Sequence, residues 1–219
     1  LEKNNYLVHE ASYNSIIGDK TDICHWNAKF RDQMDSILSS GNQDEKLPGN
    51  ARNRIVLFKS CYPNNAIMAD GVDPGDPDSC DKTMANYRAA YNVLLSYFEK
   101  YPDTLFVVLT APPLVEPKSI VVDRIKVILK RDDTVEKVGR RAREFNNWLK
   151  DTDKGWLHDY RLNNVVVFDY YDVLTDHGAS NWSRYPSGEK DSHPNGEGNT
   201  KAAREIVPFL NKAVHRMGF

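Results

Sequence analysis

The stretch that decides the fold is Leu105-Phe106-Val107-Val108-Leu109-Thr110, which Pro112 and Pro113 follow closely. The stretch is apolar at nearly every position, so both faces of a strand built from it would be buried. Strands of this kind are typical of parallel sheets that helices cover on both sides. The two prolines end the segment, because proline cannot donate a hydrogen bond to a strand ladder. We therefore predict a buried strand over residues 105–110.

Similar segments lie on both sides of this strand. Apolar runs of strand length occur at residues 54–59 and 165–169, and a shorter candidate strand occurs at residues 6–9. Between and after these strands, apolar residues recur with the spacing of amphipathic helices, in the segments around 30–38, 87–98, 138–149 and 203–217. Strands that alternate with helices are the mark of an α/β protein. We expect one domain, residues 1–219, built as a three-layer α/β/α sandwich around a parallel sheet.

The composition argues against several kinds of partner. The chain has 219 residues, 40% of them hydrophobic, which is enough for the core of one domain. Its 29 Lys and Arg residues nearly balance its 31 Asp and Glu residues, so its charge favours neither nucleic acid nor a membrane surface. No apolar run reaches the roughly 18 residues of a spanning helix. The segment 124–143 mixes basic with acidic residues, which is typical of an exposed helical face. We expect a soluble protein.

Three cysteines allow one disulfide within the chain. Cys61 and Cys80 bracket a segment rich in Pro, Gly and Asp, so we expect a disulfide between them and a buried, unpaired thiol at Cys24. The acidic residues of this segment lack the spacing of a calcium loop, and we expect no metal and no cofactor. The cysteine usage favours a secreted or periplasmic protein, and the Asn181-Trp182-Ser183 sequon would matter only in a eukaryotic secretory route.

A carboxylate and an imidazole stand two positions apart in Asp191-Ser192-His193-Pro194, just before the last predicted helix. A histidine in such a turn can take a proton from a nucleophile, and a nearby carboxylate can orient it and stabilise the imidazolium. In a parallel sheet, ligands bind beyond the carboxyl ends of the strands, where the following segments converge. Asp191 and His193 are therefore a candidate orienting group and base. The alternative is a helix cap with a packed imidazole.

Several motifs, in their order along the chain, resemble the SGNH/GDSL hydrolase superfamily. They are Phe58-Lys59-Ser60-Cys61-Tyr62-Pro63-Asn64-Asn65, the strand at 105–110 running into Ala111-Pro112-Pro113, the strand at 165–169, and Asp191-Ser192-His193-Pro194. The resemblance implies a flavodoxin-like α/β/α sandwich and an esterase, lipase or carbohydrate deacetylase that uses Ser, His and Asp. By the same resemblance His193 is the base, Asp191 is the orienting carboxylate, and Asn64 and Gly18 donate to the oxyanion hole.

The chain departs from this family at the nucleophile. Family members begin with a strand that ends in Gly-Asp-Ser or a similar turn, and no segment ahead of Tyr6 fits that strand. If residues 6–9 are the second family strand, we expect an N-terminally trimmed form, or another segment in the place of the first strand. The nucleophile is therefore unknown, and the candidates within the chain are Ser12, Ser15 and Ser60. A second departure is that one residue, rather than two, separates the Asp from the His.

Two functions are compatible with these motifs. The first is an SGNH-type serine ester hydrolase that acts on a small-molecule or carbohydrate ester, for example an acylated carbohydrate. The second is a catalytically silent domain of the same type that binds a glycan or another small ligand through Tyr62, Trp182 and Tyr185, which lie in predicted cleft loops. The presence of a competent nucleophile beside His193 would distinguish them.

Overall fold

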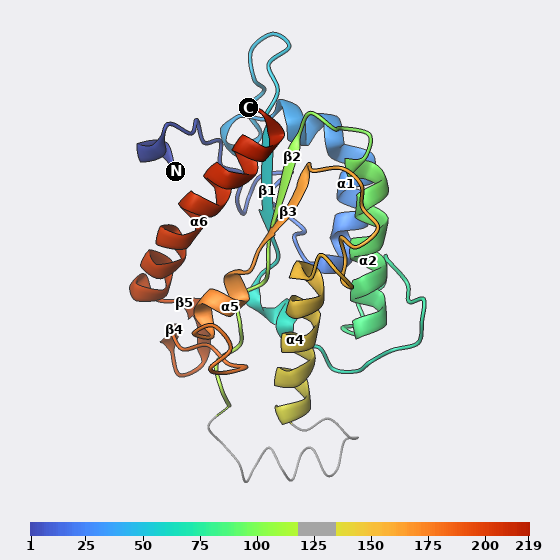
Figure 1. Ribbon diagram of the computed structural model, residues 1–219, viewed down its shortest axis with the longest axis vertical. Helices are drawn as coiled ribbons and strands as arrows, with labels where there is room; N and C mark the ends of the chain where they lie inside the picture. Colours follow the sequence, from blue (N-terminus) through green and yellow to red (C-terminus); the bar gives the residue numbers. More distant parts are fainter. Residues whose placement is uncertain (118–134) are drawn as a thin grey trace.

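The computed structural model describes residues 1–117 and 135–219, and in this part the chain is a mixed α/β protein (Figure 1). A parallel sheet has the strand order β1-β2-β3, with bounds Ile55–Lys59, Leu105–Leu109 and Val165–Phe168. A separate antiparallel pair consists of β4 (Pro186–Gly188) and β5 (Asp191–Pro194). The strands predicted at 54–59, 105–110 and 165–169 are confirmed to within one residue at each end.

Helices lie before, between and after these strands. The α-helices are α1 (Ile23–Ser39), α2 (Met84–Phe98), α4 (Val135–Lys150), α5 (Tyr170–Leu174) and α6 (Gly196–Met217). The described residues also form three short 3-10 helices, η1 (Glu2–Asn4), η2 (Asn42–Asp44) and η3 (Tyr62–Asn65). None of the helices in the described part of the chain combines the length and the apolar character needed to span a bilayer.

The central strand β2 divides the core into two clusters. All five of its residues are buried, as its uniformly apolar sequence predicts. Phe106 and Val108 pack in one cluster with side chains of α1, α2 and α4, whereas Leu105, Val107 and Leu109 pack in the other with α5 and α6. This division follows from the alternation of side chains along a strand. In Figure 1 the strands accordingly lie between α6 and the pair α1 and α2.

The segment at residues 6–9 does not form the predicted strand. Its side chains make isolated hydrogen bonds instead: the Tyr6 hydroxyl donates to Asn211 Oδ1 at 2.7 Å, and His9 Nδ1 lies 2.9 Å from Asn53 Oδ1. Within the described residues, β1 is consequently an edge strand of the sheet.

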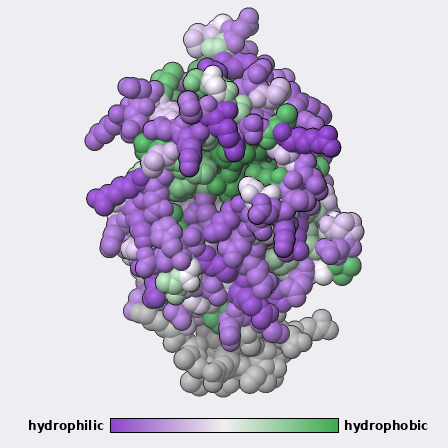
Figure 2. Space-filling view, in the orientation of Figure 1, coloured by the Kyte–Doolittle hydropathy of each residue, from purple (hydrophilic) through white to green (hydrophobic). Residues whose placement is uncertain are grey.

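A hollow of about 650 Å³ runs beside β1. It is lined by all of β1, by residues of α1 that include Trp26 and Phe30, and by residues 6–13. Most of the face shown in Figure 2 is hydrophilic, with an apolar area near its middle, over the strands of the sheet.

The disulfide differs from the predicted one. Cys24 pairs with Cys80, with their Cα atoms 5.0 Å apart, and Cys61 is the free cysteine. Cys24 lies in the first turn of α1, and Cys80 lies shortly before α2, which packs against α1. The prediction failed because it judged Cys61 and Cys80 by the loop they bracket, whereas helix packing brings Cys24 to Cys80 across a longer separation.

Candidate functional site

The candidate site is built on β5, which carries both residues of the predicted pair. His193 Nδ1 lies 2.6 Å from Asp191 Oδ1, and the His193 backbone N–H donates to the same oxygen at 3.0 Å. Residues two apart on a strand point to the same side, so the single intervening residue suits this geometry. Ser192 points the other way, where its buried hydroxyl accepts a hydrogen bond from the Val115 backbone N–H at 2.9 Å.

The hydrogen bonds to Asp191 keep its carboxyl group ionised. The His193 backbone N–H and then its side chain lower the pKa of Asp191 below the ordinary value of a carboxyl group. A carboxylate at Nδ1 holds the proton there, which leaves Nε2 with the lone pair that a base needs. The side chains of His193 and Asp191 are 60% and 51% exposed, so a solute can reach both.

Cys61 lies on the other side of the imidazole. The Cys61 Sγ atom is 3.9 Å from His193 Nε2. Cys61 lies between the end of β1 and the start of η3. The ring of Tyr62 meets the His193 ring edge-on, with their centroids 4.8 Å apart. This contact was not predicted, because Cys61 was expected to form a disulfide. The position of Cys61 in the sequence could have indicated the contact, because Cys61 follows a strand whose carboxyl end was predicted to face the site.

Tyr13 is a further residue of this site that the sequence did not indicate. The Tyr13 side chain is exposed, and the charge that the nearby Cys61 thiol can carry raises the pKa of its phenol, with smaller contributions in the same direction from desolvation and from Asp22. Tyr13 and Cys61 both line the hollow beside β1, so the site opens into that hollow.

The predicted oxyanion donors are already engaged within the protein. Asn64 is buried, and its amide donates to Asp22 Oδ1 at 2.7 Å and to the Cys61 carbonyl at 3.1 Å, while its oxygen accepts from the Ile23 N–H. Asn64 thus holds the start of α1 against the segment that carries Cys61. The Gly18 N–H donates to Ser15 Oγ at 2.7 Å. Neither arrangement leaves a donor hydrogen of these groups unused.

The three serine candidates make structural contacts. Ser60 is buried, and its hydroxyl accepts from the indole N–H of Trp26 at 2.9 Å. Ser15 donates to the Ser12 carbonyl at 2.9 Å, and the Ser12 hydroxyl accepts from the Gln43 amide at 2.7 Å. Among residues 1–117 and 135–219, the structure places none of these hydroxyls in contact with His193.

The two other predicted aromatic residues are packed against helices. A Cβ added at Gly139 of α4 would lie 2.8 Å from the Trp182 ring, and one added at Gly198 of α6 would lie 2.7 Å from Tyr185 Cβ. These glycines therefore allow Trp182 and Tyr185 to approach the helix backbones closely. Of the three aromatic residues proposed to bind a ligand, Tyr62 is the one that contacts His193.

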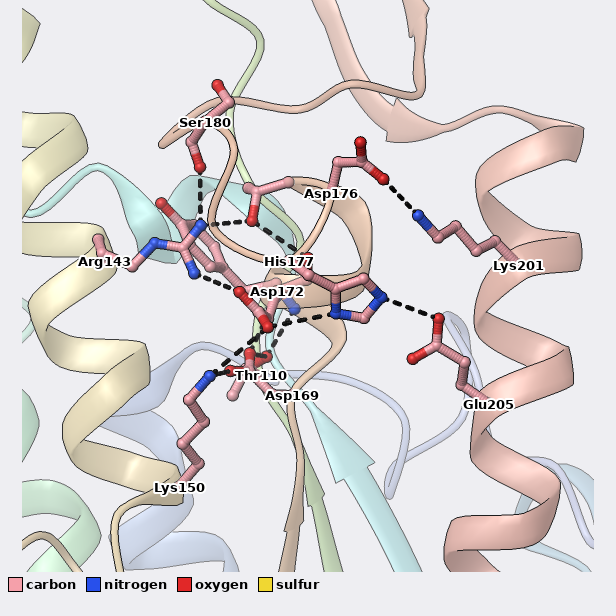
Figure 3. A network of polar contacts seen from close by, with 12 residues as sticks. Thr110, Arg143, Lys150, Asp169, Asp172, Asp176, His177, Ser180, Lys201 and Glu205 are labelled. Carbon is pink, nitrogen blue, oxygen red and sulfur yellow. Dashed lines mark hydrogen bonds and ion pairs between the residues drawn. The ribbon is translucent and has the colours of Figure 1, made fainter.

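A second polar cluster, the Arg143 network, lies beyond the end of β3 (Figure 3). Arg143 pairs with Asp172 at 2.6 Å and donates to the Thr175 hydroxyl and the Ser180 carbonyl. Lys150 pairs with Asp169 at 2.7 Å. In Figure 3 the cluster joins α4 to α5, and His177 extends it to Glu205 on α6.

The Arg143 network corrects the interpretation of its segment as an exposed helical face. The Arg143 side chain is 15% exposed and its partner Asp172 is 19% exposed, and Arg141 is buried. Residues 124–134 of that segment lie outside the described residues. Burial would raise the pKa of Asp172, but the Arg143 hydrogen bond and the nearby positive charges outweigh it and lower the pKa. Because its charged groups are paired with one another, we interpret the network as structural: it holds α4, α5 and α6 together.

Compared with protein-family models, curated proteins and solved structures, the chain matches none.

Proposed function

We propose that this chain is an SGNH-type ester hydrolase whose base is His193 and whose orienting carboxylate is Asp191. The observation that carries the proposal is the contact of Asp191 with His193 Nδ1 at 2.6 Å, which turns Nε2 toward the thiol of Cys61 at 3.9 Å. The flavodoxin-like, three-layer α/β/α sandwich is part of the same proposal, and the parallel sheet with core clusters on both faces supports it.

The pair suits acyl transfer in a specific way. Nε2 of His193 removes the proton of a nucleophile that attacks the ester carbonyl, and the resulting imidazolium then protonates the departing alcohol. Asp191 stabilises the imidazolium between these steps, and the lowered pKa of Asp191 keeps it ionised into mild acid. The exposure of both side chains favours a small or sugar-bound acyl ester, because a short acyl group can reach Nε2 from solvent.

One form of the proposal uses a serine on a further strand beside β1. The Leu105 N–H donates to the Arg54 carbonyl, so the backbone groups of residues 54, 56 and 58 face β2. Those of Ile55, Leu57 and Lys59 face the open edge, where Leu57 is 39% exposed. A parallel strand on this edge would end beside Cys61 and could present a serine to His193.

A second candidate function is glycan binding without catalysis. It is favoured by the engagement of the Asn64 and Gly18 donors, since an oxyanion would have to displace their present partners. The close packing of the Trp182 ring on α4 weighs against it, because a ring packed against a helix offers less surface for stacking on a sugar.

Hydrolysis of p-nitrophenyl acetate tests the proposed function. His193→Ala is expected to lower kcat/KM by about 10²–10⁴-fold, the range of general acid–base catalysis. His158→Ala is a matched control, because His158 is also an exposed imidazole beside a carboxylate, that of Asp159 at 3.6 Å. Equal rates for the parent and His193→Ala would refute the proposal, and glycan binding by a silent protein would support the alternative.

A further inference from the structure

We propose that Cys61 is a nucleophile, and that Cys61, His193 and Asp191 form a catalytic triad within this chain. The inference rests on the proposed function in taking His193 as the base. It goes beyond that function by assigning the attacking atom to the Cys61 thiol rather than to a serine.

The order of contacts is that of a triad. Asp191 Oδ1 contacts Nδ1 of His193 at 2.6 Å, and Nε2 of the same ring faces Cys61 Sγ at 3.9 Å. Each nitrogen thus has the partner that its role requires. The sulfur distance is at the long end of a hydrogen bond to sulfur, and such contacts in ligand-free sites shorten when a substrate binds.

The thiol is chemically available. The disulfide between Cys24 and Cys80 uses the other two of the three cysteines, so Cys61 is the free thiol of this chain. It is partly exposed and lines the hollow that extends along β1. Asn64 fixes the backbone at Cys61, because its side-chain amide donates to the Cys61 carbonyl at 3.1 Å. A thiol held in this way needs no movement of the backbone to remain beside Nε2.

The three candidate serines, Ser12, Ser15 and Ser60, are less suitable for this role. The hydroxyl of Ser60 is buried and accepts from Trp26, and those of Ser12 and Ser15 hydrogen-bond within the segment before α1 and to Gln43. A thiol is also more easily deprotonated than a hydroxyl, so a single imidazole activates it more readily.

The reaction follows in two balanced steps. His193 Nε2 takes the thiol proton, Cys61 Sγ bonds to the acyl carbon, and the ester C–O bond breaks as the imidazolium returns the proton to the leaving alkoxide. The products are an alcohol and a thioester on Cys61. Water then gives a proton to Nε2 and attacks the thioester carbon, the C–S bond breaks, and the imidazolium reprotonates the thiolate. The net reaction consumes one ester and one water and releases one acid and one alcohol.

Alkylation of the folded protein with iodoacetamide tests the activation of Cys61 without any substrate. Peptide mapping should locate the label on Cys61, and His193→Ala should slow its alkylation several-fold, while His158→Ala should leave the rate unchanged. Equal alkylation rates in the parent and in His193→Ala would overturn the inference. Circular dichroism of each variant checks that it is folded.

An acid quench during turnover of p-nitrophenyl acetate tests the covalent step. We expect one acetyl group on Cys61 in the parent, none in Cys61→Ala, and loss of turnover in Cys61→Ala. If Cys61→Ala retains turnover that His193→Ala abolishes, the nucleophile is another residue, so the Cys61 inference fails while the proposed function stands. If neither variant changes the rate, both fail.

Discussion

The disulfide between Cys24 and Cys80 leads to a prediction that can be worked out from the chain separation. The bond closes a loop of 56 residues. In the loop-entropy model, a crosslink of this span removes enough freedom from the unfolded chain to stabilise the fold by about 4 kcal/mol at 25 °C. At about 2–4 °C per kcal/mol for a domain of this size, its removal should lower Tm by about 8–16 °C.

The perturbation is the double variant Cys24→Ala with Cys80→Ala, in which alanine avoids placing a hydroxyl at the buried Cys24 position. Urea unfolding followed by tryptophan fluorescence gives the free energy of unfolding of the variant and of the parent. Cys61→Ala is the matched control. Cys61 forms no disulfide, so its substitution should leave the free energy of unfolding nearly unchanged. Peptide mapping without reduction should recover Cys24 and Cys80 joined. A loss below about 1 kcal/mol would refute the estimate, and a mapped bond between Cys61 and Cys80 would refute the pairing.

Three further predictions concern single residues. Asp191→Asn should preserve the fold but lower kcat/KM by up to about 10⁴-fold, because an amide no longer fixes the His193 tautomer; an unchanged ester hydrolysis rate would contradict this. Ser60→Ala should leave turnover unchanged yet lower the free energy of unfolding by about 1–3 kcal/mol, because the buried Trp26 indole N–H loses its acceptor; a variant of parental stability in urea would show that the indole finds another acceptor. The folded-state pKa of Asp172 is lowered, so its pairing stabilises the fold fully above the unfolded value, about 3.9, and that contribution is lost as the pH falls through the folded pKa. Acid titration followed by circular dichroism should therefore find that Asp172→Asn loses less stability than the parent between neutral and strongly acidic pH, and parallel curves would rule out this contribution.

The sequence predicted the three strands of the parallel sheet because a strand covered on both sides needs apolar residues on both faces, as β2 has. It also predicted the pairing of Asp191 with His193, which are only two positions apart, although it placed them in a turn and they lie on the short strand β5. Residues 6–9 were misassigned, because a short apolar run carries no information on whether a partner strand is present.

The contacts that the sequence missed are long-range ones. Cys61 and His193 are 132 residues apart, and no local pattern relates them. The same holds for Cys24 and Cys80, which meet because α1 packs on α2. Arg143 looks like a surface residue from its charged neighbours, and its burial follows from partners on α5 and in the loop beyond it. Each of these contacts depends on the packing of elements rather than on the residues next to them.

Within residues 1–117 and 135–219 the outer edge of β1 is unpaired, which has a consequence for the behaviour of the protein at high concentration. Natural edge strands carry charges, prolines or bulges that discourage pairing with other molecules. On β1 the first four residues, Ile55 to Phe58, are all apolar, and Lys59 is the single charge, at the end of the strand. The edge is therefore a template for the strand of a neighbouring molecule. We expect turbidity and loss of monomer to rise with protein concentration well below the unfolding temperature, with β1 as the segment where association begins.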